Sequence, residues 1–174
     1  PNTMSDLESQ SGYGVALPSA AVSSGHFDLQ PGEALIVKIP QIDSAGMNGI
    51  ELMNVYATNL PATLAQTSLN GTQSFLSGDG YTYYVVSATN PGVANWLDSG
   101  GVTSGEIYMR YQNIPLADRP PVPLPVETQV VPVDEVAKYL PADTPAVSPA
   151  QYAADMTARV LSYNYALDNA RVDG

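Results

Sequence analysis

Short segments rich in β-forming residues, each closed by a turn signal, constrain the fold of this chain most strongly. The segments cover residues 34–39, 49–57, 81–88 and 105–112. The turn signals between them are Pro31-Gly32, Gly78-Asp79-Gly80, Asn90-Pro91-Gly92 and Ser99-Gly100-Gly101. β-branched and aromatic residues favour strands, whereas Pro and Gly favour tight turns. Regularly spaced short strands are typical of sandwiches and barrels, so we expect an all-β domain over residues 25–131, an antiparallel β-sandwich or jelly roll.

The last of these segments has a clear alternation of side chains. Because successive side chains of a strand point to opposite faces, Ile107, Met109 and Tyr111 should share one face. The intervening residues, Glu106, Tyr108 and Arg110, should share the other. We therefore expect a strand with one buried face and one polar face.

The segments on either side of the predicted sandwich differ from it in composition. Residues 1–24 are small and polar without an apolar period, which predicts an extended N-terminal arm. A proline-rich strap follows the sandwich, since proline cannot donate a ladder hydrogen bond. Its prolines are Pro115, Pro120, Pro121, Pro123 and Pro125. We expect this strap to run as polyproline or as an edge strand across the sandwich.

The C-terminal part, residues 132–174, is predicted to be a helical extension. Asp134 could cap a short helix that Pro141 ends, and Ser148 to Gln151 match a capping box with proline at the first helical position. An apolar stripe at helical spacing follows, made of Tyr152, Met156, Val160, Tyr163 and Leu167. This amphipathic helix should lie on the sandwich or on a neighbouring subunit.

Composition excludes several classes of partner. The chain has 17 acidic and 6 basic residues, giving a net charge of −11, and the basic residues are scattered. A nucleic acid or an anionic membrane surface would be repelled by most of this surface. The 174 residues include no cysteine, and no apolar run is long enough to span a membrane. Charged residues make up only 13%, and the Ser-, Thr- and Asn-rich remainder leans towards a secreted or cell-envelope location.

Association is expected because the N-terminal arm has no core of its own. Such a segment needs something to pack on. We therefore predict a homo-oligomer, a partner chain or a missing N-terminal domain. The absence of an initiator methionine at Pro1 agrees with a leader or a domain that precedes it.

Five blocks of sequence resemble one bacterial family in the order in which they occur. They are residues 27–29, 31–35, 67–70, 91–98 and 105–111, and the strongest lies around Asn95-Trp96-Leu97-Asp98. Residues 25–115 are similar to the bacterial domain of unknown function numbered 1214, in its actinobacterial version. The resemblance implies a jelly-roll sandwich that forms the C-terminal portion of a longer protein, and it implies no reaction. The chain departs from the family at Gly49-Ile50, where a tryptophan is frequent, and at Val102, where a histidine is frequent.

The single histidine limits the chemistry that this chain can perform. A cupin-type metal centre needs two or three histidines, and His26 lies in a predicted turn without a nucleophile motif beside it. We therefore expect no catalytic residue, no metal site and no cofactor. His26 is better explained as a cap on the first strand.

The candidate ligand-binding residues are Asn95, Trp96, Asp98 and Arg110. Asp98 follows the lone tryptophan, and Arg110 lies on the strand that returns from the same loop. One interpretation is a partly buried ion pair that pins the loop to the sheet through bidentate hydrogen bonds. The other is the floor of a ligand pocket beside Trp96, in which Arg110 recognises a carboxylate or a sulfate. In both, Asn95 satisfies backbone groups of the turn.

Two functional hypotheses follow from these residues. The first is a non-catalytic β-sandwich that serves assembly or binds a partner or ligand, which the eleven tyrosines favour. The second is a hydrolase-like enzyme acting on a carbohydrate or lipid, with its cleft near Trp96, Asp98 and Arg110. They differ in whether the residues around Trp96 open into a pocket.

Overall fold

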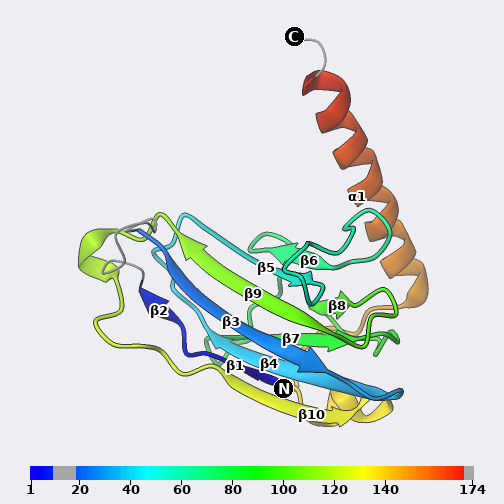
Figure 1. Ribbon diagram of the computed structural model, residues 1–174, viewed down its shortest axis with the longest axis horizontal. Helices are drawn as coiled ribbons and strands as arrows, with labels where there is room; N and C mark the ends of the chain where they lie inside the picture. The colour runs from blue at the N-terminus through cyan, green and yellow to red at the C-terminus, as the bar shows by residue number, and fades with distance from the viewer. Residues whose placement is uncertain (10–18, 171–174) are drawn as a thin grey trace.

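Two β-sheets packed face to face form the body of the protein in a computed structural model, which describes residues 1–9 and 19–170 (Figure 1). The larger sheet contains β1 (Thr3–Met4), β2 (Glu8–Ser9), β3 (Ala21–Asp28), β5 (Met47–Met53), β6 (Ser68–Asn70) and β9 (Ser104–Gln112). The smaller sheet contains β4 (Glu33–Pro40), β7 (Tyr81–Ser87), β8 (Trp96–Asp98) and β10 (Glu127–Pro132). The predicted β-sandwich is confirmed.

The strand order places β9 and β7 inside their sheets. The larger sheet runs β1-β3-β9-β5-β6, with β2 also pairing with β3, and the smaller sheet runs β10-β4-β7-β8. Every pair is antiparallel except β7 with β8, which is parallel. The prediction of a purely antiparallel sandwich is therefore wrong for this pair. A parallel pair needs a crossover connection, and the loop of residues 88–95 provides it here.

The core lies between the two sheets and follows the alternation expected for β9. Ile107, Met109 and Tyr111 are fully buried, whereas Glu106, Tyr108 and Arg110 lie on the opposite face. Val37 of β4 and Val86 of β7 belong to the same buried cluster. A second cluster covers the outer face of the smaller sheet, where Ile36 and Val85 pack with Val131 and Val136. Strand β4 is consequently apolar on both faces, as expected for a strand that is covered twice.

The N-terminal segment contributes strands to the larger sheet. Strands β1 and β2 pair with β3, which begins at Ala21, and Leu7 between them is fully buried. The described residues of the segment 1–24 therefore pack on their own chain and not as a free arm. Residues 10–18 of the predicted arm lie outside the described residues.

The proline-rich segment contains a short 3-10 helix, η1 (Leu116–Asp118), before it continues into β10. Leu124 exchanges two backbone hydrogen bonds with Leu7, with N···O distances of 2.8 and 3.0 Å. β10 then pairs with β4 at the edge of the smaller sheet. β10 begins at Glu127, after the last proline of the predicted strap, so the strap itself stays a prediction.

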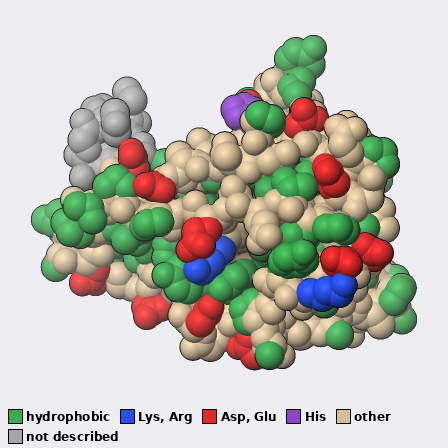
Figure 2. Space-filling model, turned by 90° about the horizontal axis from the view of Figure 1, so that it is seen from below, with side chains coloured by type: hydrophobic (Ala, Val, Ile, Leu, Met, Phe, Trp, Pro, Cys, Tyr) green, Lys and Arg blue, Asp and Glu red, His purple; other side chains and the backbone are tan. Residues whose placement is uncertain are grey.

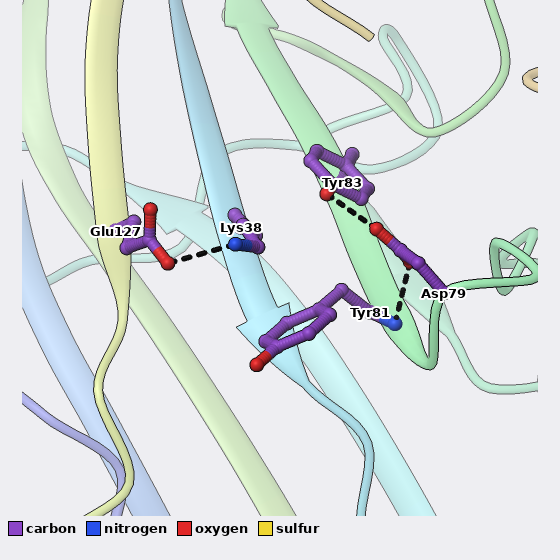
Figure 3. Close-up of polar contacts among 5 residues, drawn as sticks. All are labelled: Lys38, Asp79, Tyr81, Tyr83 and Glu127. Atoms are coloured by element: carbon purple, nitrogen blue, oxygen red, sulfur yellow. Dashed lines mark hydrogen bonds and ion pairs between the residues drawn. The ribbon is translucent and has the colours of Figure 1, made fainter. Parts of the chain in front are cut away.

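Polar side chains join three strands across the outer face of the smaller sheet (Figure 3). Lys38 Nζ lies 2.8 Å from Glu127 Oε1 and 4.3 Å from the centre of the Tyr81 ring. The Tyr83 hydroxyl donates to Asp79 Oδ2 over 2.7 Å, and this bond lowers the pKa of Asp79. The contacts fix the β7 turn beside β4 and β10, although solvent-exposed pairs of this kind contribute little stability.

Acidic side chains are spread over the surface, and the basic groups visible in Figure 2 lie against acidic ones. The two Lys–Glu pairs of the described residues are Lys38 with Glu127 and Lys138 with Glu135. Most acidic groups of the described residues have no basic partner, in keeping with the net charge of −11.

The C-terminal extension consists of η2 (Val133–Lys138), a 3-10 helix, and α1 (Pro149–Ala170). Ser148 Oγ accepts a hydrogen bond from the Gln151 backbone over 3.1 Å, which confirms the predicted N-cap. Only the first half of α1 lies against the sandwich, and the second half projects away from it (Figure 1). Tyr163 and Leu167, which we expected on the packed stripe, are exposed by 53% and 41%. Beyond Val160 the stripe therefore does not pack on the sandwich, and the other predicted alternative, a neighbouring subunit, stays a prediction for this half.

The close approach of β3, β5 and β9 at Gly105 yields a test of the fold. A Cβ atom at Gly105 would overlap the Met53 carbonyl oxygen and come within 2.9 Å of the Phe27 ring. We predict that Gly105→Ala lowers the free energy of unfolding by about 2 kcal/mol, because backbone must move to admit the methyl group. Urea denaturation measures this effect.

Gly49 on the neighbouring strand β5 is the matched control. A Cβ atom there would meet only the Leu69 carbonyl oxygen, at 3.7 Å. Gly49→Ala should leave the stability within about 0.5 kcal/mol of the unsubstituted protein. Equal losses for the two variants would contradict the packing described for β9.

Candidate functional site

The segment around Trp96 forms the short edge strand β8, and its side chains are held from several sides. Trp96 is 5% exposed, and its indole Nε1 donates to the Ser87 carbonyl over 3.1 Å. Asn95 adopts a positive φ of 59°, a conformation that asparagine tolerates better than most residues. Its side chain donates to the Phe75 carbonyl and accepts from the Phe75 backbone N–H, both over 2.7 Å. Trp96 is therefore buried, whereas Asn95 satisfies the backbone of Phe75, 20 residues earlier, and not groups of its own turn as we expected.

Helix α1 docks on this strand through Tyr152. The Tyr152 ring lies 4.8 Å from the Trp96 ring, with the planes tilted by 44°. Its hydroxyl donates to Asp98 Oδ2 over 2.8 Å and accepts from the Gln66 backbone N–H over 3.3 Å. Gln66 in turn donates its side-chain amide to the Trp96 carbonyl over 2.6 Å. One tyrosine thus joins the helix, the edge strand and the loop before β6.

Burial and the Asp98 hydrogen bond raise the pKa of Tyr152 to about 12. The folded protein holds this proton more tightly than the unfolded chain does, for which the ordinary value is 10.0. The contribution of this group to stability is therefore fully present below pH 10 and is lost as the pH rises through about 12.

A cleft of about 460 Å³ lies between α1 and the loops beside β8. Its apolar wall includes Val93, Trp96 and Tyr152. Polar groups line the remainder, namely Gln66, Gln73, Asn95, Asp155, Arg159 and Ser162. An apolar wall with a few convergent polar groups is the usual character of a small-molecule site.

Arg159 is the cation of this cleft. It is half-buried, and its guanidinium donates to the Ser68 carbonyl over 2.8 Å and to Ser68 Oγ over 3.3 Å. Burial lowers its pKa below the ordinary value. No carboxylate lies within ion-pair distance of it among the residues that the structure describes.

The predicted Asp98–Arg110 ion pair does not form among the described residues, so the interpretation in which it pins the loop to the sheet is wrong. Neither residue lines the cleft beside Trp96, so the pair does not form its floor either. Asp98 lies on β8 in the smaller sheet, whereas Arg110 lies on the outer face of the larger sheet. The carboxylate of Asp98 accepts from Tyr152 and from the Gly100 backbone N–H instead. Arg110 lines a second hollow of about 330 Å³ that also includes Arg159. Between β8 and β9 the chain passes from the smaller sheet to the larger one, and the sequence spacing does not reveal this change.

Sequence reasoning missed the roles of Tyr152 and Arg159. Tyr152 was identified only as the first residue of an apolar stripe, and a stripe does not indicate which strand it meets. Arg159 falls between stripe positions on the same helix, and no motif distinguishes it from a solvent-exposed arginine. The position of Arg159 directly beside Val160 of the stripe is the one signal that could have indicated it.

Within residues 1–9 and 19–170, no group of three or more His, Cys, Asp or Glu side chains gathers as a metal site would require. His26 lies on β3 with Nε2 3.5 Å from Glu106 Oε1, away from the cleft lining. None of the helices in the described part is long and apolar enough to cross a membrane.

The placement of Asp98 and Arg110 leads to a paired prediction on stability. Both oxygens of Asp98 accept hydrogen bonds, so Asp98→Asn removes a charge-assisted acceptor, since an amide nitrogen cannot accept from the Tyr152 hydroxyl. We expect it to lower the free energy of unfolding by about 1–2 kcal/mol. Arg110→Ala should change it by no more than about 0.5 kcal/mol, since Arg110 is exposed. Thermal or urea denaturation of the two variants measures these changes. A loss of about 3 kcal/mol in unfolding free energy for Arg110→Ala would contradict this placement and support a buried ion pair.

Comparisons with known proteins support the fold and give no activity. No protein-family model and no curated protein matches the chain. A solved structure of an uncharacterised protein from Burkholderia cenocepacia is similar, with a TM-score of 0.60 and 24% identity. The match covers 68% of this chain and 31% of the other, so this chain spans about a third of that protein's length. A likeness at this level of identity shows a shared fold and nothing of function.

Proposed function

We propose that this chain is a non-catalytic β-sandwich domain that binds a small ligand in the cleft between α1 and β8. The observation that carries the proposal is the docking of α1 through Tyr152, which leaves a hollow of about 460 Å³ beside a buried tryptophan. Apolar walls supply affinity, and the polar groups of Gln66, Gln73 and Arg159 supply orientation. The ligand would contact residues from three separate parts of the chain.

The alternative, a hydrolase-like enzyme near Trp96, has less support. A general acid or base needs a carboxyl group free to exchange a proton with the substrate. Both Asp98 oxygens already accept hydrogen bonds, and Arg110 lies on the other sheet. Asp155 remains as a carboxylate of the cleft, with one oxygen accepting from Gln151 over 2.8 Å. A single carboxylate does not make the pair that glycoside hydrolysis requires.

We also propose a relation to the domain-of-unknown-function family 1214 of actinobacteria, with jelly-roll topology. Its support is the order of the five sequence blocks, of which the Trp96 block and β9 adjoin the two hollows. The proline-rich segment is proposed to act as a strap between the sheets. The backbone pairing of Leu124 with Leu7 supports this role, because β10 begins shortly after it.

The cleft is tested by filling it. Ala158 lines the cleft, whereas Ala154, one turn earlier on α1, is exposed and lines neither hollow. We expect uncharged aromatic compounds (phenol, indole and phenylacetamide) to shift the backbone NMR signals of residues 94–96 and 155–159. Ala158→Phe should abolish these shifts, and Ala154→Phe should retain them.

The outcome that contradicts a cleft ligand is equally direct. Either no compound of the set shifts those signals, or the shifts persist unchanged in Ala158→Phe. With phenol and phenylacetamide the lone tryptophan gives a second measurement, since its fluorescence then reports on the Trp96 environment. A quenching response confined to the unsubstituted protein and Ala154→Phe would agree with binding.

Assembly is the second candidate function, and the projecting half of α1 favours it. Leu161, Tyr163, Tyr165 and Leu167 are exposed there, Leu161 by 65% and Tyr165 by 73%. At about 3.6 residues per turn, Leu161 and Tyr165 share one face of α1, and Tyr163 and Leu167 share a nearly opposite face. Exposed apolar groups of this kind mark interfaces, and tyrosine is enriched at them. A homo-oligomer or a separate N-terminal domain would cover this half of the helix.

Sedimentation velocity distinguishes assembly through α1 from other surfaces. We expect the protein to self-associate at micromolar concentration and the double variant Leu161→Glu, Tyr165→Glu to be monomeric. Burying two charges in an apolar interface is unfavourable, so the equilibrium shifts to monomer. Ala154→Glu is the control on the same helix and should associate normally. A monomeric unsubstituted protein, or a double variant that still associates, contradicts this proposal.

A further inference from the structure

The positive charges of this acidic protein are unevenly paired. Both lysines lie 2.7–2.8 Å from a glutamate oxygen. Among the described residues, neither Arg110 nor Arg159 has a carboxylate within ion-pair distance. These two arginines line the same hollow of about 330 Å³, although they come from β9 and α1. With 17 acidic residues in the chain, two converging arginines without a carboxylate partner need an explanation.

Arg159 is poised to accept an anion. A guanidinium has five N–H donors, and two hydrogen bonds to Ser68 fix its position. Three donors therefore stay available on a side chain that is already held in place. A half-buried cation without a counter-ion loses hydration that a bound anion would compensate. The cost of ordering the side chain has been met before any ligand arrives.

Arg110 stands beside an open part of the larger sheet. In the pairing of β5 with β9, Arg110 lies opposite Gly49 of β5, which has no side chain to fill the space. An added Cβ at Gly49 would find only the Leu69 carbonyl oxygen, at 3.7 Å. The hollow is therefore left open at the position where the Arg110 side chain reaches it.

Glu51 limits the charge of the anion. It lines the same hollow, and its Oε2 accepts a hydrogen bond from Asn59 over 2.8 Å. A ligand with a second negative charge would be repelled by this carboxylate and by the net charge of −11. A monoanion satisfies the arginines without that penalty, and a carboxylate matches the planar fork of a guanidinium.

Arg159 also lines the cleft beside Trp96, so the two hollows meet at its side chain. We infer that the ligand of the cleft is an amphipathic monocarboxylate. Its apolar body lies against Trp96 and Tyr152, and its carboxylate binds Arg159 with Arg110 as a second, outer contact. This inference rests on the proposed function, because it specifies the chemical class of the cleft ligand.

Phenylacetate and phenylacetamide form a matched pair of probes, equal in shape and different in charge. Trp96 fluorescence, with NMR shifts at residues 155–159, measures their affinities. We expect phenylacetate to bind about tenfold more tightly than phenylacetamide, the size typical of a charge-assisted hydrogen bond. Inorganic phosphate, a probe with more than one charge near neutral pH, should bind more weakly than phenylacetate.

The arginine variants locate the carboxylate. Arg159→Gln should remove most of the preference for phenylacetate, and Arg110→Gln should reduce phenylacetate affinity about threefold because its guanidinium is exposed and screened. Neither should alter phenylacetamide binding by a comparable factor. Lys138→Gln removes an equal charge from a residue that lines neither hollow, so it should leave the affinities unchanged. Because Arg110 is exposed, Arg110→Gln should fold, and it still tests the inference if Arg159→Gln does not.

Each contrary result has a separate meaning. Equal affinities for the two probes, both lost in Ala158→Phe, would overturn the carboxylate inference and leave the cleft as a binding site. Loss of phenylacetate binding in Lys138→Gln as in Arg110→Gln would reduce the effect to net charge and also overturn it. Phosphate binding more tightly than phenylacetate would replace the monocarboxylate by a multiply charged anion. Binding of neither probe in the cleft would overturn the proposed function itself.

Discussion

Tyr152 holds helix α1 against the sandwich by two interactions at once, and the candidate site exists only because of them. Its ring packs on Trp96, and its hydroxyl reaches Asp98 on the same strand. Without the helix, this edge strand of three residues would expose one side of its indole and one carboxylate oxygen of Asp98. The helix therefore completes the edge of the smaller sheet while leaving a cleft above it. Edge strands are commonly covered in this way to prevent pairing with other chains.

The distribution of charge follows from the same docking. Helix α1 carries Arg159 to the end of β6, where Ser68 binds it, and so brings a cation next to the outer face of the larger sheet. The lysines, by contrast, pair with glutamates on the surface of their own sheet or helix. Ser68 also belongs to the short strand β6, whose Leu69 lines both hollows. Local backbone geometry at β6 thus decides where the positive charge of this acidic domain is available.

Much of the sandwich could be predicted from the sequence, because the burial of a strand leaves a local record. The alternation of Ile107, Met109 and Tyr111 reports the core face directly. Ser148 reports the start of α1 through the hydrogen bond that its side chain accepts from the Gln151 backbone. The two-sided burial of β4 is recorded as an unbroken apolar run from Ala34 to Val37. Signals of this kind depend on neighbours a few residues away. They survive without knowledge of the tertiary structure.

The contacts that define the site leave no such record. Asp98 and Arg110 are close in sequence and sit on different sheets, since the chain changes sheet between β8 and β9. Tyr152 and Asp98 are 54 residues apart, and nothing at either position encodes the other. The parallel pairing of β7 with β8 is equally invisible, because both strands look alike whichever way they run. Sequence periodicity specifies which faces are buried, and topology specifies which faces meet.

The same geometry couples ligand binding to the position of α1. A ligand in the cleft would contact the helix through Arg159 and the sandwich through Trp96, so it would bind the docked arrangement better than an undocked one. Binding and helix docking must then stabilise each other to the same extent, by thermodynamic linkage. The exposed second half of α1 moves with the first half as one rigid element of 22 residues. Occupancy of the cleft would therefore fix the direction in which the apolar groups of that half are presented to a partner.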